Sequence, residues 1–90
     1  MLIQVDIPDY DAINGIQYNW VLGFEIEIKL INNALLIRAN KEGLESLANH
    51  LLNLSQNNVP SGAHMHFDEN NSLEEGSIEL IIEKKGDISN

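Results

Sequence analysis

The sequence predicts an α+β fold, in which four to five antiparallel strands form one sheet and a single main helix covers one face. Two patterns predict this class. Apolar residues occupy every even position from 16 to 30, which is the period of a half-buried strand. Residues 41–56 repeat leucines at intervals of three and four, which gives a helix one apolar side. The predicted order along the chain is strand, strand, strand, helix, strand, strand.

The first thirty residues contain two of these strands. Residues 2–7 alternate weakly up to Pro8 and predict an edge strand, and the stretch up to residue 15 is a turn-rich loop. Residues 16–30 predict one long strand, or two strands continued through a bend at Gly23. Tyr18 and Trp20 share its apolar side, so we expect both aromatic rings to belong to the core.

A tight hairpin follows at Asn32 and Asn33, because asparagine tolerates the positive φ angles of a two-residue turn. Pairing Ile31 with Ala34 then places apolar pairs on one face of the hairpin and an opposite-charge pair on the other. The register pairs Leu30 with Leu35, Ile28 with Ile37, and Glu27 with Arg38.

Residues 41–56 form the predicted helix, with Asn40 as its N-cap. We expect one side to face the sheet, namely Leu44, Leu47, Ala48, Leu51, Leu54 and Ser55. The solvent side would then hold Glu45, Asn49 and Asn53. His50 lies at the border of the apolar side, and we expect it to pack there.

Residues 62–68 and 77–84 are the last two predicted strands, and an acidic loop connects them. Ser72 and Glu75 have the spacing of a capping box, which predicts a single helical turn in this loop. We expect residues 85–90 to be a frayed tail.

Length and composition predict one domain over residues 1–90, with 43% hydrophobic and 21% charged residues. A chain of this size buries only about 60–65% of its unfolded surface, so a deep catalytic cleft would compete with the core for the same side chains.

No cysteine is present, which excludes disulfides and thiolate metal ligands. No Gly-rich phosphate loop follows a predicted strand, so we expect no cofactor and no enzyme activity.

The charge balance is strongly acidic, with fourteen acids, five bases and a formal net charge of −9. A phosphate backbone repels such a surface, so we expect a basic protein partner rather than direct binding of nucleic acid.

The chain begins without a basic region followed by a long apolar stretch, and no eighteen apolar residues occur together. These features predict a cytoplasmic protein with no membrane contact.

The uncovered face of the sheet carries the main functional prediction. If the apolar positions of each strand face the helix, the charged positions face away from it together. We expect this face and the acidic loop to bind the partner, although the solvated side of any one-sided sheet is also charged. The predicted partner-binding residues are Glu25, Glu27, His64, His66, Asp68, Glu74, Glu75, Glu79 and Glu83.

A metal site is the alternative for residues 64–68, because the run His64, His66 and Asp68 resembles the first metal-binding run of metallo-β-lactamase-type hydrolases. Two histidines at alternate strand positions lie on one side, roughly 6.6 Å apart, and could share a metal ion. A catalytic zinc needs a third held ligand, and residue 69 is glutamate where that run ends in histidine. A small metal-dependent hydrolase and an acidic regulatory or nucleic-acid-mimic protein remain the two alternative functions.

Four stretches of the chain resemble the immunity protein 32 family of bacterial polymorphic toxin systems, namely residues 39–44, 47–52, 64–68 and 71–84. The histidine run followed by NSLEEGSIELIIEK is the most specific part, and the resemblance covers about residues 35–84. It implies a cytoplasmic immunity protein that binds and blocks one cognate toxin, and it carries over no catalytic residue. Its motif positions here are His64, His66, Asp68, Ser72, Glu74, Glu75 and Glu79. The acidic charge suits a basic, nuclease-like toxin.

Overall fold

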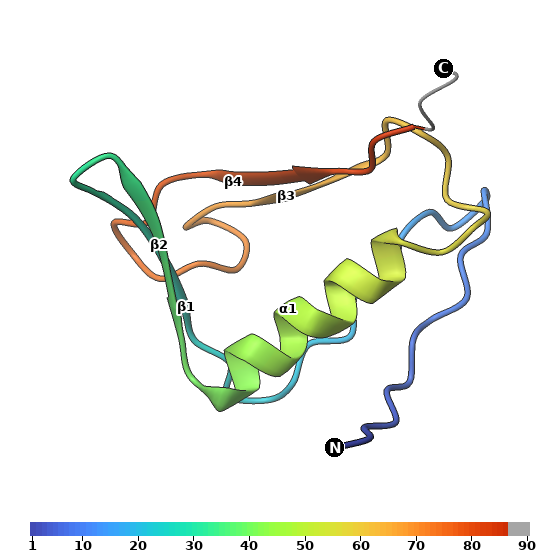
Figure 1. Ribbon diagram of the computed structural model, residues 1–90, viewed down its shortest axis with the longest axis horizontal. Helices are drawn as coiled ribbons and strands as arrows, with labels where there is room; N and C mark the ends of the chain where they lie inside the picture. The colour runs from blue at the N-terminus through green and yellow to red at the C-terminus, as the bar shows by residue number, and fades with distance from the viewer. Residues whose placement is uncertain (87–90) are drawn as a thin grey trace.

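The computed structural model describes residues 1–86, which form one helix and two small antiparallel sheets (Figure 1). The elements are β1 (Ile26–Ile31), β2 (Ala34–Ala39), α1 (Lys41–Leu54), β3 (His64–Phe67) and β4 (Leu80–Glu83). β1 pairs with β2, and β3 pairs with β4. The β1–β2 hairpin stands at one end of the molecule, and α1 and the β3–β4 sheet extend away from it (Figure 1).

The α+β class is confirmed, but the single sheet of four to five strands is wrong. Residues 74–78 run beside β1 without continuing its ladder. The N–H groups of Glu74 and Ile78 donate to the carbonyls of Ile26 and Ile28 at 2.8 and 2.9 Å. The N–H of Ile28 donates to the Ser77 hydroxyl at 3.1 Å instead of a backbone carbonyl. Because a side chain replaces the backbone acceptor here, the ladder stops and the chain turns away to form β4 with β3.

The strands predicted over residues 2–7 and 16–25 are also absent, although residues 26–30 of the long predicted strand lie in β1. The first 25 residues cross the helix, whose side chains bind their backbone in place of a neighbouring strand. The hydroxyl of Ser46 accepts from the N–H of Val21, and the side-chain amide of Asn53 donates to the carbonyl of Gln17. The amide of Asn49 donates to the carbonyl of Asp6 at 3.0 Å. From this segment Ile16, Trp20 and Phe24 pack against the core, whereas Leu22 is 96% exposed, so the predicted alternating apolar face is only partly buried and no ladder forms.

Only part of the predicted apolar side of α1 faces the core. The buried helix residues are Gly43, Ser46, Leu47, Asn49, His50, Asn53 and Leu54. Leu44, Ala48 and Leu51 are exposed, although the sequence predicts that they face the sheet. Asn49 and Asn53, predicted to face solvent, are buried. The helix is covered from two directions, by the sheets and by the crossing N-terminal segment, so its buried surface is wider than one apolar stripe.

The local features around the hairpin are confirmed. Asn32 and Asn33 adopt φ angles of 49° and 66°, and the paired residues follow the predicted register. The side chain of Asn40 accepts from the N–H of Gly43 at 2.8 Å and caps α1. The helix ends at Leu54, two residues earlier than predicted. The predicted tail lies outside the described residues from residue 87 onward.

The hydrophobic core lies between α1 and the two sheets and contains Ile26, Ile28, Leu47, Leu54, Val59, Met65, Phe67 and Leu73. An aromatic cluster joins it. Tyr18 and Trp20 make edge contacts with the ring of His50, with centroids 5.0 and 4.3 Å apart, and Phe67 stacks on that ring at 5.8 Å. His50 is fully buried and packs in the core, as predicted.

Candidate protein-docking surface

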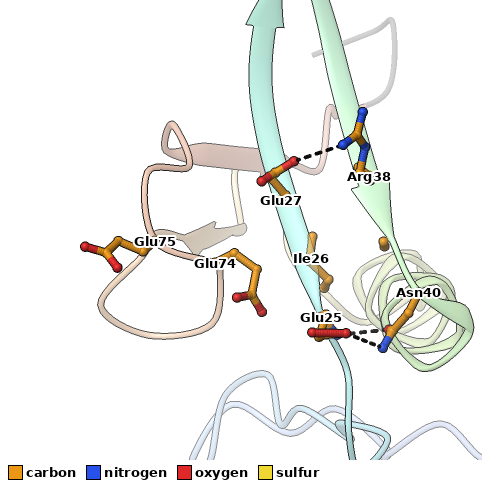
Figure 2. A pocket seen from close by; sticks show the side chains of 8 residues that line it. Glu25, Ile26, Glu27, Arg38, Asn40, Glu74 and Glu75 are labelled. Atoms are coloured by element: carbon orange, nitrogen blue, oxygen red, sulfur yellow. Dashed lines mark hydrogen bonds and ion pairs between the residues drawn. The ribbon is translucent and has the colours of Figure 1, made fainter.

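Four of the predicted partner-binding glutamates line one open hollow of about 450 Å³ beside β1 (Figure 2). Glu25 directly precedes β1, Glu27 lies in β1, and Glu74 and Glu75 come from the loop that precedes β4. The other lining residues are Ile26, Arg38, Ala39 and Asn40. Two segments that are almost fifty residues apart in the chain therefore contribute glutamates to the lining of the same hollow.

The geometry of β1 and its neighbours positions these side chains. Glu25 and Glu27 are two residues apart on extended backbone, so they point to the same side. The hydrogen bond from the N–H of Glu74 to the carbonyl of Ile26 holds the loop against the strand. Figure 2 shows the Glu74 side chain pointing toward β1, while the Glu75 carboxylate is directed away from the strand.

The four carboxylates differ in how far the protein itself satisfies them. Glu27 lies between Lys29 and Arg38, with nitrogen–oxygen distances of 3.5 and 3.9 Å. Glu25 accepts from the side-chain amide of Asn40 at 3.2 Å. The carboxylates of Glu74 and Glu75 form no hydrogen bond or ion pair with the part of the chain that is described. With four glutamates and one arginine among its lining residues, the hollow favours cationic groups such as lysine ammonium or arginine guanidinium.

The remaining predicted residues form a second group around the β3–β4 sheet. His64 and His66 lie on its exposed side, because Met65 and Phe67 face the core. The Nε2 atom of His66 lies 2.9 Å from Glu79 Oε1 and 3.6 Å from Asp68 Oδ2. Glu83 stands opposite His64 in the strand register. The nine predicted residues thus belong to two groups, one at each sheet, instead of a single continuous sheet face.

The loop after β3 folds through Asp68, and the helical turn predicted at residues 72–75 does not form. The Asp68 carboxylate accepts from the N–H groups of Asn70 and Asn71, at 2.9 and 3.1 Å. The Asp68 carbonyl accepts from the N–H of Leu73 at 2.9 Å. This turn directs residues 74–78 back toward β1 and so brings Glu74 and Glu75 to the hollow.

The metal alternative gains no ligand set from the structure. Within residues 1–86, no three histidine, aspartate or glutamate side chains are grouped so that they could hold a metal ion. The Nδ1 atom of His64 lies 3.5 Å from the carbonyl of Gly62, and His66 pairs with carboxylates. His50, the remaining histidine, lies in the core and cannot reach the exposed side of β3.

Asn40 is a member of the site that the sequence reveals only as a helix cap. Its Oδ1 atom accepts from the N–H of Gly43 and from the N–H of Glu25, at 2.8 and 3.0 Å. Its Nδ2 atom donates to the carbonyl of Gly23 and to the carboxylate of Glu25. One asparagine therefore joins the start of α1 to the wall of the hollow. The capping position is visible in the sequence, whereas the contact with Glu25 depends on the hairpin register.

Comparison with known protein families identifies the family of this chain. The model of the family described as immunity protein 32 matches residues 34–85, more than half of the chain. The matched region begins at β2, and it includes every predicted partner-binding residue except Glu25 and Glu27. No curated protein matches the chain, and no solved structure matches it either. Among residues 1–86, no helix has the length and apolar content that a membrane span requires.

Proposed function

Because the chain belongs to the immunity protein 32 family, we propose that it neutralises a cognate, basic toxin domain by stoichiometric binding at the hollow formed by Glu25, Glu27, Glu74 and Glu75. The observation that carries the proposal is that these four glutamates, from two distant segments, line the same hollow. The net charge of −9 attracts a cationic partner over a longer range.

A nuclease-like toxin fits this surface chemically. An enzyme that binds a phosphate backbone carries lysine and arginine side chains at its substrate site. Carboxylates placed on a firm strand and an anchored loop can take the place of phosphates at such a site. Inhibition then requires no reaction, because the bound protein occupies the cationic surface that the substrate needs.

We assign the largest electrostatic contribution to Glu74 and Glu75. Their carboxylates are exposed and unpaired within the described chain, so a toxin cation gains a new partner without breaking an existing ion pair. Glu27 already interacts with Lys29 and Arg38, so it contributes less. The group formed by His64, His66, Asp68, Glu79 and Glu83 has a supporting role, because the carboxylate of Glu79 already lies 2.9 Å from the Nε2 atom of His66.

The decisive experiment measures binding to the toxin domain encoded beside the immunity gene, with two double variants of equal charge. Glu74→Lys with Glu75→Lys reverses the unpaired carboxylates of the hollow. Asp6→Lys with Asp9→Lys makes the same change in net charge on the N-terminal segment, outside the family match. We expect the first variant to weaken binding by roughly 100-fold, because like charges across an interface cost several kcal/mol, and the second by less than about threefold.

Circular dichroism must show that both double variants remain folded. Equal losses of affinity in the two variants would indicate that net charge alone drives binding. Unchanged affinity in the variant at Glu74 and Glu75 would show that the toxin binds elsewhere. A basic partner that is not a toxin, encoded beside this gene, would instead favour the acidic regulatory alternative.

A further inference from the structure

β2 has one edge to which no other segment of the described chain is hydrogen-bonded. The hydrogen bonds of β1 show which edge this is. The backbone carbonyls of Ile26 and Ile28 and the N–H of Ile28 bind residues 74–78, so the backbone groups of these two residues point away from β2. In an antiparallel pair, residues opposite one another both point either toward or away from the partner strand. Leu35 and Ile37 stand opposite Leu30 and Ile28, so their N–H and C=O groups point away from β1.

This edge lacks the features that usually prevent strands from associating. Natural edge strands are commonly interrupted by proline, bulges or inward-pointing charges. β2 has six residues, an uninterrupted register with β1, no proline, and Arg38 as its one charged residue. Its backbone is therefore available to pair with another extended strand.

The side chains of residues 34–37 along the edge are aliphatic, and all are exposed except Leu36, which is half-buried. Leu35 is 52% exposed and Ile37 is 43% exposed, and the register places both on the face that holds the buried Ile26 and Ile28. On the opposite face, Leu36 lies between Ala34 and Arg38 along the strand. A strand added at this edge would therefore meet apolar side chains on both faces.

The charges around the edge distinguish it from the acidic hollow. The stretch from Lys29 to Lys41 contains three basic residues and no acidic residue. Lys29 and Arg38 lie within 4 Å of Glu27, and Lys41 lies 3.1 Å from Glu45, so each base already has an acidic partner in the same chain. This nearly neutral region offers little attraction to a cationic toxin, but it can meet an identical region with little repulsion.

We propose that the β2 edge binds a second copy of this chain, forming a two-fold dimer with the continuous strand order β1–β2–β2–β1. In this arrangement Leu35 of one copy pairs with Ile37 of the second copy, and the two-fold axis passes at Leu36. Each of these pairs exchanges two backbone hydrogen bonds. The same groups serve on both sides of the axis, which is the self-complementarity that a two-fold interface requires. The dimer does not depend on the proposed toxin site.

Sedimentation equilibrium on the purified chain tests this proposal directly. We expect the mean mass to rise from 10.1 kDa toward twice that value as the protein concentration increases. Each copy carries a net charge of −9, so the dimer should become more stable when sodium chloride is raised from about 50 to about 500 mM. A mass that stays at 10.1 kDa at every concentration and salt level would overturn the proposal.

Leu36→Glu is the most informative variant. Within one chain residue 36 faces Lys29, so the new carboxylate suits the hairpin, whereas across the two-fold axis it faces its own copy. We expect association to weaken at least tenfold while the melting temperature stays the same or rises. Ile81→Glu is the control, because it adds the same charge at an exposed residue of β4. Equal weakening by both variants would place the contact elsewhere.

Ile37→Pro provides a second, independent variant. It removes an N–H group that points away from β1 and leaves the hydrogen bonds of the hairpin in place. We expect this variant to be monomeric with unchanged circular dichroism. A wild-type protein that is monomeric, together with loss of toxin binding in Leu36→Glu, would assign the edge to the toxin and overturn the dimer.

Discussion

At the scale of single residues, His50 shows most clearly how tertiary structure changes the chemistry of a side chain. Its ring is fully buried against Tyr18, Trp20 and Phe67, and neither ring nitrogen has a hydrogen-bond partner in residues 1–86. Burial lowers the pKa of His50 from 6.5 to about 4, because a charged imidazolium would lose its hydration in this aromatic environment. The folded protein therefore keeps this histidine neutral.

The lowered pKa predicts acid sensitivity with a defined sign. Above pH 6.5, His50 is neutral in both the folded and the unfolded chain, so its contribution to stability is complete. As the pH falls from 6.5 to about 4, only the unfolded chain takes up the proton, and about 3 kcal/mol of stability is lost. We expect His50→Phe to remove this loss, measured by urea unfolding with Trp20 fluorescence between pH 4 and pH 7.5.

His64→Gln is the matched control for this prediction, because His64 is exposed on β3. It should leave the pH dependence of the wild-type protein unchanged. If His50→Phe showed the same pH dependence as wild type, the acid sensitivity would have to come from other groups.

At the scale of elements, the contact between α1 and the hairpin depends on the absence of a side chain at residue 43. A Cβ atom at Gly43 would lie 2.9 Å from Ile26 Cγ1 and 3.0 Å from Ala39 Cβ, and it would also press on the carbonyl of Glu25. Helix propensity alone disfavours glycine in the first turn. Packing accounts for glycine at residue 43, because the absence of a Cβ atom lets the helix approach the strands beside the acidic hollow.

This packing predicts that Gly43→Ala destabilises the protein by about 1–3 kcal/mol, the usual cost of overfilling a well-packed contact. Helix propensity by itself would predict a gain of up to about 1 kcal/mol. Chemical denaturation distinguishes the two signs. Glu45→Ala, an exposed change on the same helix, should alter stability by no more than about 0.5 kcal/mol. A stabilised Gly43→Ala protein would show that the helix can move away from the hairpin without loss.

At the scale of the whole molecule, the two proposed binding surfaces differ in their charge. The acidic hollow is proposed to attract a cationic toxin, and the nearly neutral β2 edge is proposed to bind a second copy. Salt acts on these two contacts in opposite directions, because it screens attraction in the first and net repulsion in the second. The two proposals can therefore fail independently.

The acidic charge of the hollow predicts that association with the toxin becomes slower as the salt concentration rises. Between about 50 and about 500 mM sodium chloride the Debye length falls from about 14 to about 4 Å. We expect the association rate constant, measured by stopped-flow fluorescence, to fall about tenfold or more, with a smaller change in the dissociation rate constant. An association rate that does not depend on salt would remove electrostatic steering from the proposed mechanism.

Features that depend on near neighbours could be predicted from the sequence. The turn at Asn32 and Asn33, the register of β1 with β2, and the cap at Asn40 are each decided within a few residues by backbone preference and cross-strand pairing. The exposed side of β3 was predictable for the same reason, since alternation alone places His64 and His66 opposite the buried Met65 and Phe67.

Other features depend on which segments meet. Asn49 and Asn53 are buried because they bind the backbone of a segment more than thirty residues away. No local pattern distinguishes such an asparagine from one in solvent. The predicted long strand failed for a related reason, because an alternating segment can pack against helix side chains as well as against a strand.

The sequence by itself determined the acidic charge, the local geometry of the hairpin and cap, and the family to which residues 34–85 belong. The tertiary structure decided that the glutamates divide between two sheets and that Glu74 and Glu75 line the same hollow as Glu25 and Glu27. It also decided that no other segment within residues 1–86 pairs with the outer edge of β2. The reason is physical: backbone preferences act within a few residues, whereas the replacement of a ladder hydrogen bond by Ser77 is a contact between distant segments.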